Sequence, residues 1–159
     1  MAGMLQQASA PARIREANSN EARRLYEIDR LCFPDFMAYS WPEMIFYLRH
    51  PQAVNRVAEL DGATVGFAIG RVGPHLRAHV ITLDVILEAR RRKIGTMLML
   101  ALHEEFCRRG MTESVLEVDA LNEAAHRFYL GLGYGQQELL RGYYRNRRDA
   151  FQMILRLQE

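Results

Sequence analysis

A carboxylate, an amide and a phenol occur close together in the second half of the chain. Glu117 sits in an apolar, strand-like run, and Asn122 stands where the next helix begins, as a natural N-cap. Tyr129 follows about two helical turns later and therefore projects from the same face as Asn122. A carboxylate buried without a partner has a raised pKa and is a candidate general base, whereas a phenol with a pKa of about 10 can donate a proton to a departing thiolate or alkoxide. Taken singly, Glu117 as half of an ion pair and Tyr129 as a core aromatic are the structural alternatives.

A second candidate site is a run of four consecutive cations that ends at a predicted helix start. The first turn of a helix has backbone N–H groups without intrahelical partners, and the helix dipole adds positive charge there. A glycine and a threonine follow, so phosphate oxygens can approach the backbone closely. Cations here oppose the dipole by ~0.3–1 kcal/mol each, a conflict that a bound anion removes; a solvated turn is the alternative. The residues expected at the anion are Arg90, Arg91, Arg92, Lys93, Ile94, Gly95 and Thr96.

Other motifs in the sequence do not carry a recognisable chemistry. The glycine run at residues 131–136 lacks the last glycine of a dinucleotide-binding loop and follows a helix rather than a strand. The histidines show no metal-ligand spacing, so no metal site is expected, and His103 and His126 are expected on helix surfaces. Cys32 and Cys107 fall in helical patterns and are expected to be reduced thiols in or near the core of a cytoplasmic protein.

The composition is that of an ordinary globular domain. The chain has 159 residues, of which 49% are hydrophobic and 25% are charged, enough for one domain with a proper core. A net charge of +2 is too small for a general nucleic-acid coat, and no apolar run reaches membrane-spanning length. We therefore expect no membrane partner and no direct nucleic-acid role. A short mobile tail is expected at residues 1–11, before a single domain at residues 12–159.

Hydrophobic periodicity indicates the elements that must position these groups. Ser40 and Glu43 have the spacing of a capping box, and Asp61-Gly62 predicts a hairpin turn. An antiparallel meander followed by alternating strands and helices predicts an α/β domain, with a mixed central sheet and helices on both faces. Strands are predicted at residues 12–17, 54–60, 63–72, 78–87, 115–118, 135–140 and 150–157, and helices at residues 21–33, 40–50, 94–109 and 122–130.

The segment between the first two predicted helices, residues 33–41, is rich in aromatic residues and methionine. One interpretation is a loop that packs beneath the sheet, because large apolar side chains in a loop are commonly buried. The other is one wall of a binding groove, with Phe33 at its start.

Two stretches together resemble the GNAT superfamily of acetyl-coenzyme A-dependent N-acetyltransferases. Residues 85–96 resemble the signature R/Q-x-x-G-x-G/A, with Lys93 in place of the usual first glycine and Leu87 where proline is common. Residues 116–134, LEVDALNEAAHRFYLGLGY, and the later R-x-Y-Y and D-A-x-x-M patterns are similar to bacterial ribosomal-protein alanine N-acetyltransferases. They are also similar to the catalytic subunits of archaeal and eukaryotic N-terminal acetyltransferases. The resemblance extends over residues 13–157 and implies the GNAT fold.

The resemblance also implies a co-substrate, acetyl-coenzyme A, and a role for each matching residue. Glu117 is the implied general base and Tyr129 the implied general acid near the coenzyme sulfur. The implied coenzyme contacts are the backbone of Leu83, Asp84 and Val85 at the acetyl-pantetheine arm, Arg91 to Thr96 at the pyrophosphate, and Asn122. Phe33 and Tyr143 are implied at the acceptor.

The leading hypothesis is acetyl transfer to the N-terminal α-amine of a protein or peptide, with ribosomal proteins among the candidate acceptors. Either a monomer or a homodimer in the cytoplasm is compatible with it. Acetylation of a small-molecule amine or of lysine is the enzymatic alternative. An acetyl-coenzyme A-sensing or RNA-binding module on the same fold is the non-enzymatic alternative, because fold does not fix chemistry. Two basic clusters motivate an RNA-binding role, Arg90 to Lys93 and the later group of Arg141, Arg145, Arg147 and Arg148.

Overall fold

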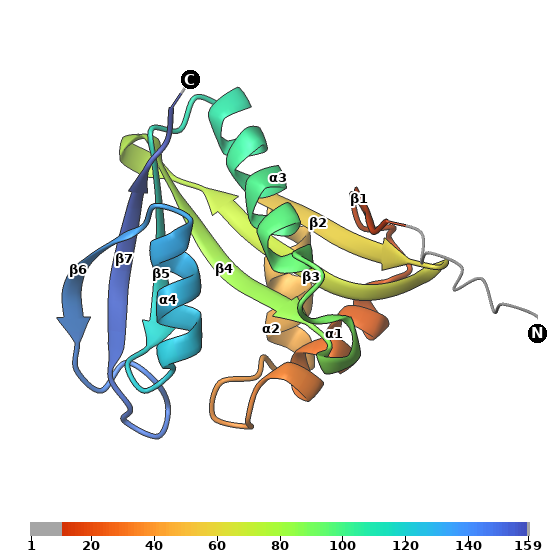
Figure 1. Cartoon of the computed structure of the whole chain (residues 1–159), viewed down its shortest axis with the longest axis horizontal. Helices are drawn as coiled ribbons and strands as arrows, with labels where there is room; N and C mark the ends of the chain where they lie inside the picture. The colour runs from red at the N-terminus through yellow and green to blue at the C-terminus, as the bar shows by residue number, and fades with distance from the viewer. Residues whose placement is uncertain (1–10, 159) are drawn as a thin grey trace, which may run out of the picture.

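A seven-stranded sheet with helices on both faces carries the whole structure (Figure 1). The computed structural model describes residues 11–158, so all but the last residue of the expected N-terminal tail, residues 1–11, lies outside the described residues. The predicted mixed sheet with helices on both faces is confirmed. In chain order the elements are β1 (Arg13–Arg15), α1 (Ala22–Cys32), α2 (Trp41–Arg49), β2 (Ala53–Leu60), β3 (Ala63–Val72), η1 (Pro74–Leu76), β4 (Arg77–Val85), η2 (Leu87–Ala89), α3 (Ile94–Arg108), β5 (Glu113–Asp119), α4 (Glu123–Gly131), β6 (Gly135–Leu140) and β7 (Ala150–Arg156).

One strand pair in the sheet differs from all the others. The spatial order is β1-β2-β3-β4-β5-β7-β6, and among residues 11–158 only β4 and β5 run parallel. They pair only at Arg77↔Glu113, Ala78↔Ser114 and His79↔Val115. Beyond His79 the two strands diverge, as Figure 1 shows, and a gap opens between them. The backbone groups of β4 that face this gap have no strand partner there.

Two local signals in the N-terminal half form as the sequence predicts. The Glu43 backbone N–H donates to Ser40 Oγ at 3.3 Å, and the Ser40 N–H donates to Glu43 Oε1 at 3.0 Å, which completes the capping box of α2. At the hairpin between β2 and β3, Asp61 has φ 51° and Gly62 has φ 81°. Two consecutive positive φ values are those of a type I′ turn, whose twist matches the flanking strands.

An apolar cluster fills each face of the sheet. In Figure 1, α3 and α4 lie on the near face, and α1 and α2 lie behind the sheet. The core between the sheet and the pair α1 and α2 contains Leu25, Ile28, Met44, Val57, Phe67 and Ile69. The core on the α3 and α4 face includes Val54, Ala58, Ala68, Val80, Ile94, Leu98, Met99, Leu102, Phe106, Leu116, Val118 and Tyr134.

The prediction that His103 lies on a helix surface is wrong. Its side chain is buried, and its Nε2 lies 2.7 Å from the hydroxyl oxygen of Tyr134, which in turn lies 2.8 Å from Ser114 Oγ. Burial lowers the pKa of His103 to about 4. Because α3 packs across β2, β3 and β4 at once, its buried stripe is wider than its apolar residues alone indicate. His126 is nearer the surface, with Nε2 2.9 Å from Gln136 Oε1.

Both cysteines are free thiols and partly buried, as the sequence predicts. The Cys32 thiol lies against the sheet, where it donates to the Val85 carbonyl at 3.4 Å, and burial raises its pKa to about 11. Within residues 11–158, no helix combines the length and the apolar character needed to cross a membrane.

Candidate functional site

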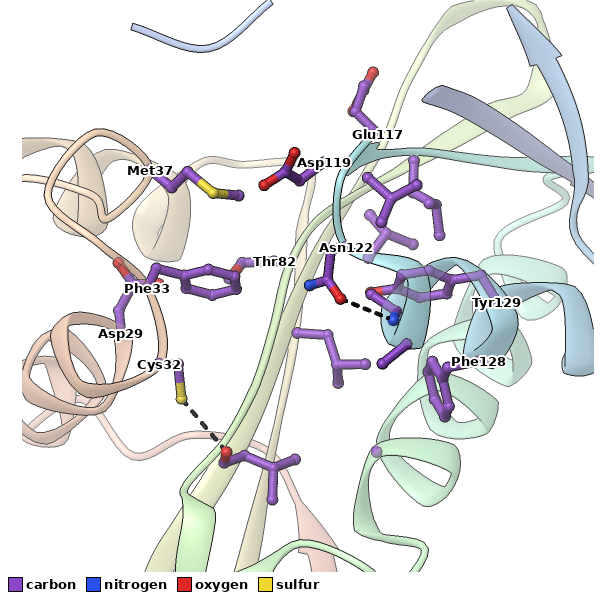
Figure 2. Close-up of a pocket in the computed structure, with 18 of the residues that line it drawn as sticks. Asp29, Cys32, Phe33, Met37, Thr82, Glu117, Asp119, Asn122, Phe128 and Tyr129 are labelled. Atoms are coloured by element: carbon purple, nitrogen blue, oxygen red, sulfur yellow. Dashed lines mark hydrogen bonds between the residues drawn. The ribbon is translucent and has the colours of Figure 1, made fainter. Parts of the chain in front are cut away.

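A cavity of about 650 Å³ occupies the gap between β4 and β5 (Figure 2). Its walls come from both diverging strands, from the end of α1 and the loop after it, and from the start of α3. One side of α4 and the loop between β6 and β7 complete it. The cavity exists because β4 and β5 stop pairing after three residues and no other strand fills the space.

The edge of β4 that faces the cavity presents backbone polar groups. The Ile81 carbonyl accepts a hydrogen bond from the Tyr39 hydroxyl at 3.2 Å, and the Val85 carbonyl accepts one from Arg90 Nε at 3.0 Å. Both carbonyls therefore point away from β3. Because the N–H and C=O groups of a strand alternate sides, those of Leu83 face the same open edge. This edge can bind an extended, amide-containing arm in place of a missing strand.

The N-terminus of α3 opens into the same cavity. Among residues 11–158, no side chain caps this helix, whereas Ser40 caps α2 and Asn122 caps α4. Lys93, at the N-cap position, has a left-handed conformation with φ 59°. Gly95 follows in the first turn and lines the cavity, so the first-turn N–H groups lie at the cavity wall. An uncapped helix start beside three lining cations has the charge and the free N–H groups that suit phosphate oxygens.

Glu117 has a partner on the neighbouring strand. Its Oε2 lies 2.5 Å from Nε2 of His79, a residue of β4 just where the parallel pairing ends. Tyr143, from the loop between β6 and β7, lies near Glu117, and burial together with the Glu117 charge raises the pKa of this phenol to about 12. The histidine holds the carboxylate at the cavity wall, with the phenol close by.

Tyr129 and Asn122 face the cavity from α4. The Asn122 Oδ1 caps the helix by accepting the Ala125 N–H at 3.0 Å, and its amide nitrogen remains for a ligand (Figure 2). The Tyr129 phenol extends from α4 into the cavity (Figure 2). Burial, and to a lesser degree Tyr134 and Asp84, raise the pKa of Tyr129. It therefore stays protonated and is able to donate its hydrogen.

Glu117 and Tyr129 approach the gap from opposite faces of the sheet. Leu116 and Val118 pack into the core on the α3 and α4 face, so Glu117 between them points to the other face. Tyr129 packs against the α3 and α4 core. Figure 2 shows the Glu117 carboxylate directed away from α4. The cavity passes between β4 and β5 and so joins a carboxylate on one face to a phenol on the other.

Ion pairs hold the loop between β6 and β7 across the cavity opening on the Glu117 side. Arg148 pairs with Asp119 at 2.7 Å and lies 5.2 Å from the ring centre of Phe36, in the segment after α1. Arg145 pairs with Glu43 of α2 at 2.7 Å. These contacts tie the C-terminal strands to the α1 and α2 side and narrow the opening to the cavity.

The structure brings together most of the residues that the sequence singled out. Of the predicted site residues, all except Asp84 and Arg92 line the cavity. The Asp84 side chain is buried on the α1 side of β4, and its backbone carbonyl faces Gly66 of β3, so the predicted backbone contact of Asp84 with a ligand in the cavity is wrong. Arg92 lies in the turn before α3, outside the cavity wall. The residues from both sites that do line it are Phe33, Leu83, Val85, Arg90, Arg91, Lys93, Ile94, Gly95, Thr96, Glu117, Asn122, Tyr129 and Tyr143.

The sequence did not predict the contacts that His79, Asp119 and Arg148 make at the site, and Arg148 was singled out there only as a cation that could bind RNA. His79 and Glu117 are far apart in the chain, and only the parallel register of β4 and β5 brings them together. The available signal was a histidine and a carboxylate on two neighbouring strands, offset by two residues since His79 pairs with Val115, but it requires knowing that those strands pair. Asp119 follows Glu117 by two residues, on the same side of β5, and that period was visible in the sequence.

Comparisons with known proteins agree in the family they indicate. A profile of the Acetyltransferase (GNAT) family matches residues 22–134. The N-alpha-acetyltransferase of Sulfurisphaera tokodaii is 31% identical over 156 residues, covering 89% of this chain and 90% of that protein. The [ribosomal protein bS18]-alanine N-acetyltransferase of Salmonella typhimurium is 31% identical over 122 residues, covering 74% and 82%. The crystal structure of Ard1 from Thermoplasma volcanium superposes with a TM-score of 0.88 at 25% identity, covering 94% of this chain and 100% of that one.

Proposed function

The chain belongs to the Acetyltransferase (GNAT) family and is an N-acetyltransferase that uses acetyl-coenzyme A, and from this premise we propose that its acceptor is the N-terminal α-amine of a protein or peptide. Relatives named as N-alpha-acetyltransferases and as a ribosomal-protein alanine N-acetyltransferase support this acceptor. The observation that carries the proposal is the cavity that joins Glu117 on one face of the sheet to Tyr129 on the other.

The residues of the cavity fit the coenzyme. The uncapped start of α3 and the cations Arg90, Arg91 and Lys93 suit the pyrophosphate, because unpaired N–H groups and positive charge stabilise phosphate oxygens. The open edge of β4 at Leu83 and Val85 suits the amides of the pantetheine arm. The coenzyme supplies an acetyl thioester, whose carbonyl is the electrophile.

Glu117 is the proposed general base for the acceptor amine. Its carboxylate removes the ammonium proton, directly or through a water molecule, while His79 fixes its orientation. An α-amine with a pKa of 7.7–8.0 is roughly 9–17% neutral at pH 7, whereas a lysine amine with a pKa near 10.4 is about 0.04% neutral. Reaching the neutral lysine amine costs about 3 kcal/mol more, so a carboxylate base suits the α-amine better.

Tyr129 and the open edge of β4 act on the thioester. The Tyr129 phenol is protonated at neutral pH and donates its hydrogen to the leaving thiolate. A backbone N–H of β4 near Val85 stabilises the negative charge that develops on the carbonyl oxygen as the amine attacks. Each proton therefore has a destination, with the ammonium proton going to the Glu117 side and the phenolic proton going to sulfur.

The shape of the opening also supports a chain terminus as acceptor. Arg145 and Arg148 hold the loop between β6 and β7 against α2 and Phe36, so the passage to Glu117 is bounded on two sides. An extended N-terminus with a small first residue passes such an opening more readily than a lysine side chain presented from the middle of a folded surface.

A peptide panel tests the proposal. Purified protein with acetyl-coenzyme A is expected to acetylate peptides with a free α-amine, and mass spectrometry locates the acetyl group. Matched peptides with a blocked N-terminus and an internal lysine are the control, and small amines complete the panel. The protein contains a single lysine, Lys93, so self-acetylation adds little background at lysine. Modification confined to lysine or to small amines would overturn the assignment of the acceptor.

A further inference from the structure

Two buried carboxyl groups that the proposed transfer does not use lie beside the cavity. Asp29 of α1 is 0% exposed and Asp84 of β4 is 1% exposed, and the two lie within hydrogen-bonding reach of each other. The Tyr39 backbone N–H donates to Asp29 Oδ2 at 2.7 Å, and the Thr82 hydroxyl donates to Asp84 Oδ1 at 2.5 Å. One oxygen of each carboxyl is thus satisfied.

The other two carboxyl oxygens lack a hydrogen-bond partner. Within residues 11–158, Asp29 Oδ1 and Asp84 Oδ2 are buried and receive no hydrogen bond from any donor. If both neighbouring carboxyl groups were ionised, neither could donate a hydrogen bond to the other. The repulsion between the two charges and the loss of their hydration would both be costly in this buried place. A single proton between the two unpartnered oxygens makes one of them a donor and the other an acceptor, which satisfies both at once.

We propose that Asp29 and Asp84 share one proton, and that this acid pair is a positioning device that holds the segment from Phe33 to Tyr39 against β4 beside the cavity. That this segment forms part of the acceptor site rests on the proposed function above. The pair does not touch the reacting atoms, and it acts through the segment that it holds.

The contacts of Tyr39 explain how the shared proton influences the position of the cavity wall. Its N–H bonds to Asp29, and its hydroxyl bonds to the Ile81 carbonyl at 3.2 Å, so the residue connects α1 to the open edge of β4. Phe33, Met37 and Tyr39 all line the cavity. When the shared proton is lost, two adjacent charges separate α1 from β4, and the segment attached to Asp29 moves with α1.

The surroundings favour retention of the proton. Burial raises the pKa of Asp84 well above its usual value, and the neighbouring Asp29 adds to the effect. Burial also raises the pKa of Asp29. The other charged or titratable groups that face the pair are Arg30 and Cys32 of α1, Tyr39 after α1, Glu43 of α2 and Tyr129 of α4.

Unfolding as a function of pH tests the shared proton without any substrate. The unfolded chain releases both protons near pH 4, whereas the folded pair keeps one, so the folding equilibrium constant of the wild type falls by up to ~10-fold per pH unit above that value. The fall ends at the raised pKa of the pair. In Asp84→Asn an amide hydrogen replaces the proton, so this slope is lost. Asp61→Asn, the same change in an exposed turn, is the matched control and keeps the wild-type slope.

Hydrogen exchange of the Tyr39 amide tests the positioning role. Compared at equal pH, Asp84→Asn keeps the Tyr39 N–H protected through pH 9. The wild type loses protection by up to ~10-fold per pH unit once the folded pair releases its proton. Asp84→Ala loses protection at every pH, because nothing satisfies the buried Oδ1 of Asp29 and the charge of this carboxylate is left without a partner. If Asp84→Ala does not fold, Asp29→Asn, which places the amide on the other partner, must reproduce the behaviour of Asp84→Asn.

Acceptor kinetics connect the pair to the reaction. Above the pH at which the folded pair loses its proton, the acceptor KM of the wild type is expected to rise relative to that of Asp84→Asn, with a constant ratio of kcat values. Parallel unfolding profiles for wild type and Asp84→Asn would overturn the shared proton. Equal Tyr39 protection in Asp84→Ala and wild type, or a constant KM ratio, would overturn the positioning role. If no peptide is acetylated, the proposed function fails, while the unfolding and hydrogen-exchange experiments still test whether Asp29 and Asp84 share a proton and hold the segment.

Discussion

Lys93 combines a strained backbone conformation with a positive charge at the proposed phosphate site, and substitutions can separate the two effects. It is the only lysine in the chain, and it has φ 59° at the N-cap of α3. Lys93→Gly removes both the backbone strain and the ammonium group. Lys93→Ala removes the ammonium group and keeps the strain, so the pair of variants forms a matched comparison.

The expected magnitudes follow from the conformation. A non-glycine residue in the left-handed region costs ~1–2 kcal/mol, and the extra chain entropy of glycine in the unfolded state offsets ~0.5–1 kcal/mol of that. Lys93→Gly should therefore be about 0.5–1 kcal/mol more stable than Lys93→Ala. For a protein of this size the difference corresponds to a Tm about 1–4 °C higher. Both variants gain a further ~0.3–1 kcal/mol, because a cation no longer opposes the helix dipole.

Coenzyme binding should change in the opposite direction. Loss of the ammonium contact to a phosphate is expected to weaken binding of coenzyme A about tenfold in both variants, which corresponds to ~1.4 kcal/mol. Calorimetric titration measures the affinity, and thermal unfolding without coenzyme measures the stability. Reductive methylation with ¹³C-formaldehyde retains the charge and labels only Lys93 and the N-terminal amine, so one side-chain resonance reports phosphate binding.

Two results would refute this reasoning. A Tm for Lys93→Gly that does not exceed that of Lys93→Ala would show that the left-handed conformation is not a source of strain. Unchanged coenzyme affinity in both variants, with a methyl-lysine resonance that does not shift on addition of coenzyme A, would show that the ammonium does not contact the phosphates.

The remaining predictions concern the reaction, the core and the opening of the cavity. Glu117→Gln and Tyr129→Phe should each lower kcat by ~10²–10⁴-fold; steady-state kinetics and coenzyme titration check this, and a loss of coenzyme affinity in place of kcat would contradict the assigned roles. Burial lowers the pKa of His103 in the folded protein, so as the pH falls the unfolded chain binds a proton at this histidine before the folded protein does. The free energy of unfolding should therefore fall by about 2–3 kcal/mol from pH 6.5 to pH 4. In His103→Asn the free energy of unfolding, measured with urea, should depend less on pH over that range. A pH dependence equal to that of the wild type would show that His103 is not its source. Arg148→Ala breaks the ion pair with Asp119 and should raise the acceptor KM several-fold while costing less than ~1 kcal/mol of stability; an unchanged KM would separate this contact from acceptor binding.

The elements were predictable because their signals are local. The capping box at Ser40 and the turn at Asp61-Gly62 each depend on residues a few positions apart. The proposed phosphate site could be located from the sequence for the same reason, since the cations and the helix start are contiguous. Asn122 and Tyr129 face one cavity because both lie on one helix at helical spacing.

The missed features depend on contacts between distant segments. The pairing of His79 with Glu117 requires the parallel register of β4 and β5, which no short stretch of sequence specifies. The acid pair requires α1 to pack on β4 at a particular height, so Asp29 on a helix pattern was indistinguishable from a surface charge. His103 was misplaced because the burial of one helix face depends on how many strands the helix crosses.

The divergence of β4 and β5 has a consequence for the kinetics of the enzyme. In the proposed reaction the coenzyme phosphates lie on the side of α3 and the amine reaches Glu117 from the side of α1 and α2, so donor and acceptor do not share a route. Neither has to depart before the other arrives, and the acyl group can pass within a ternary complex without first being attached to the protein. Initial-rate plots at several fixed acceptor concentrations should therefore intersect, in contrast to the parallel lines of a ping-pong enzyme.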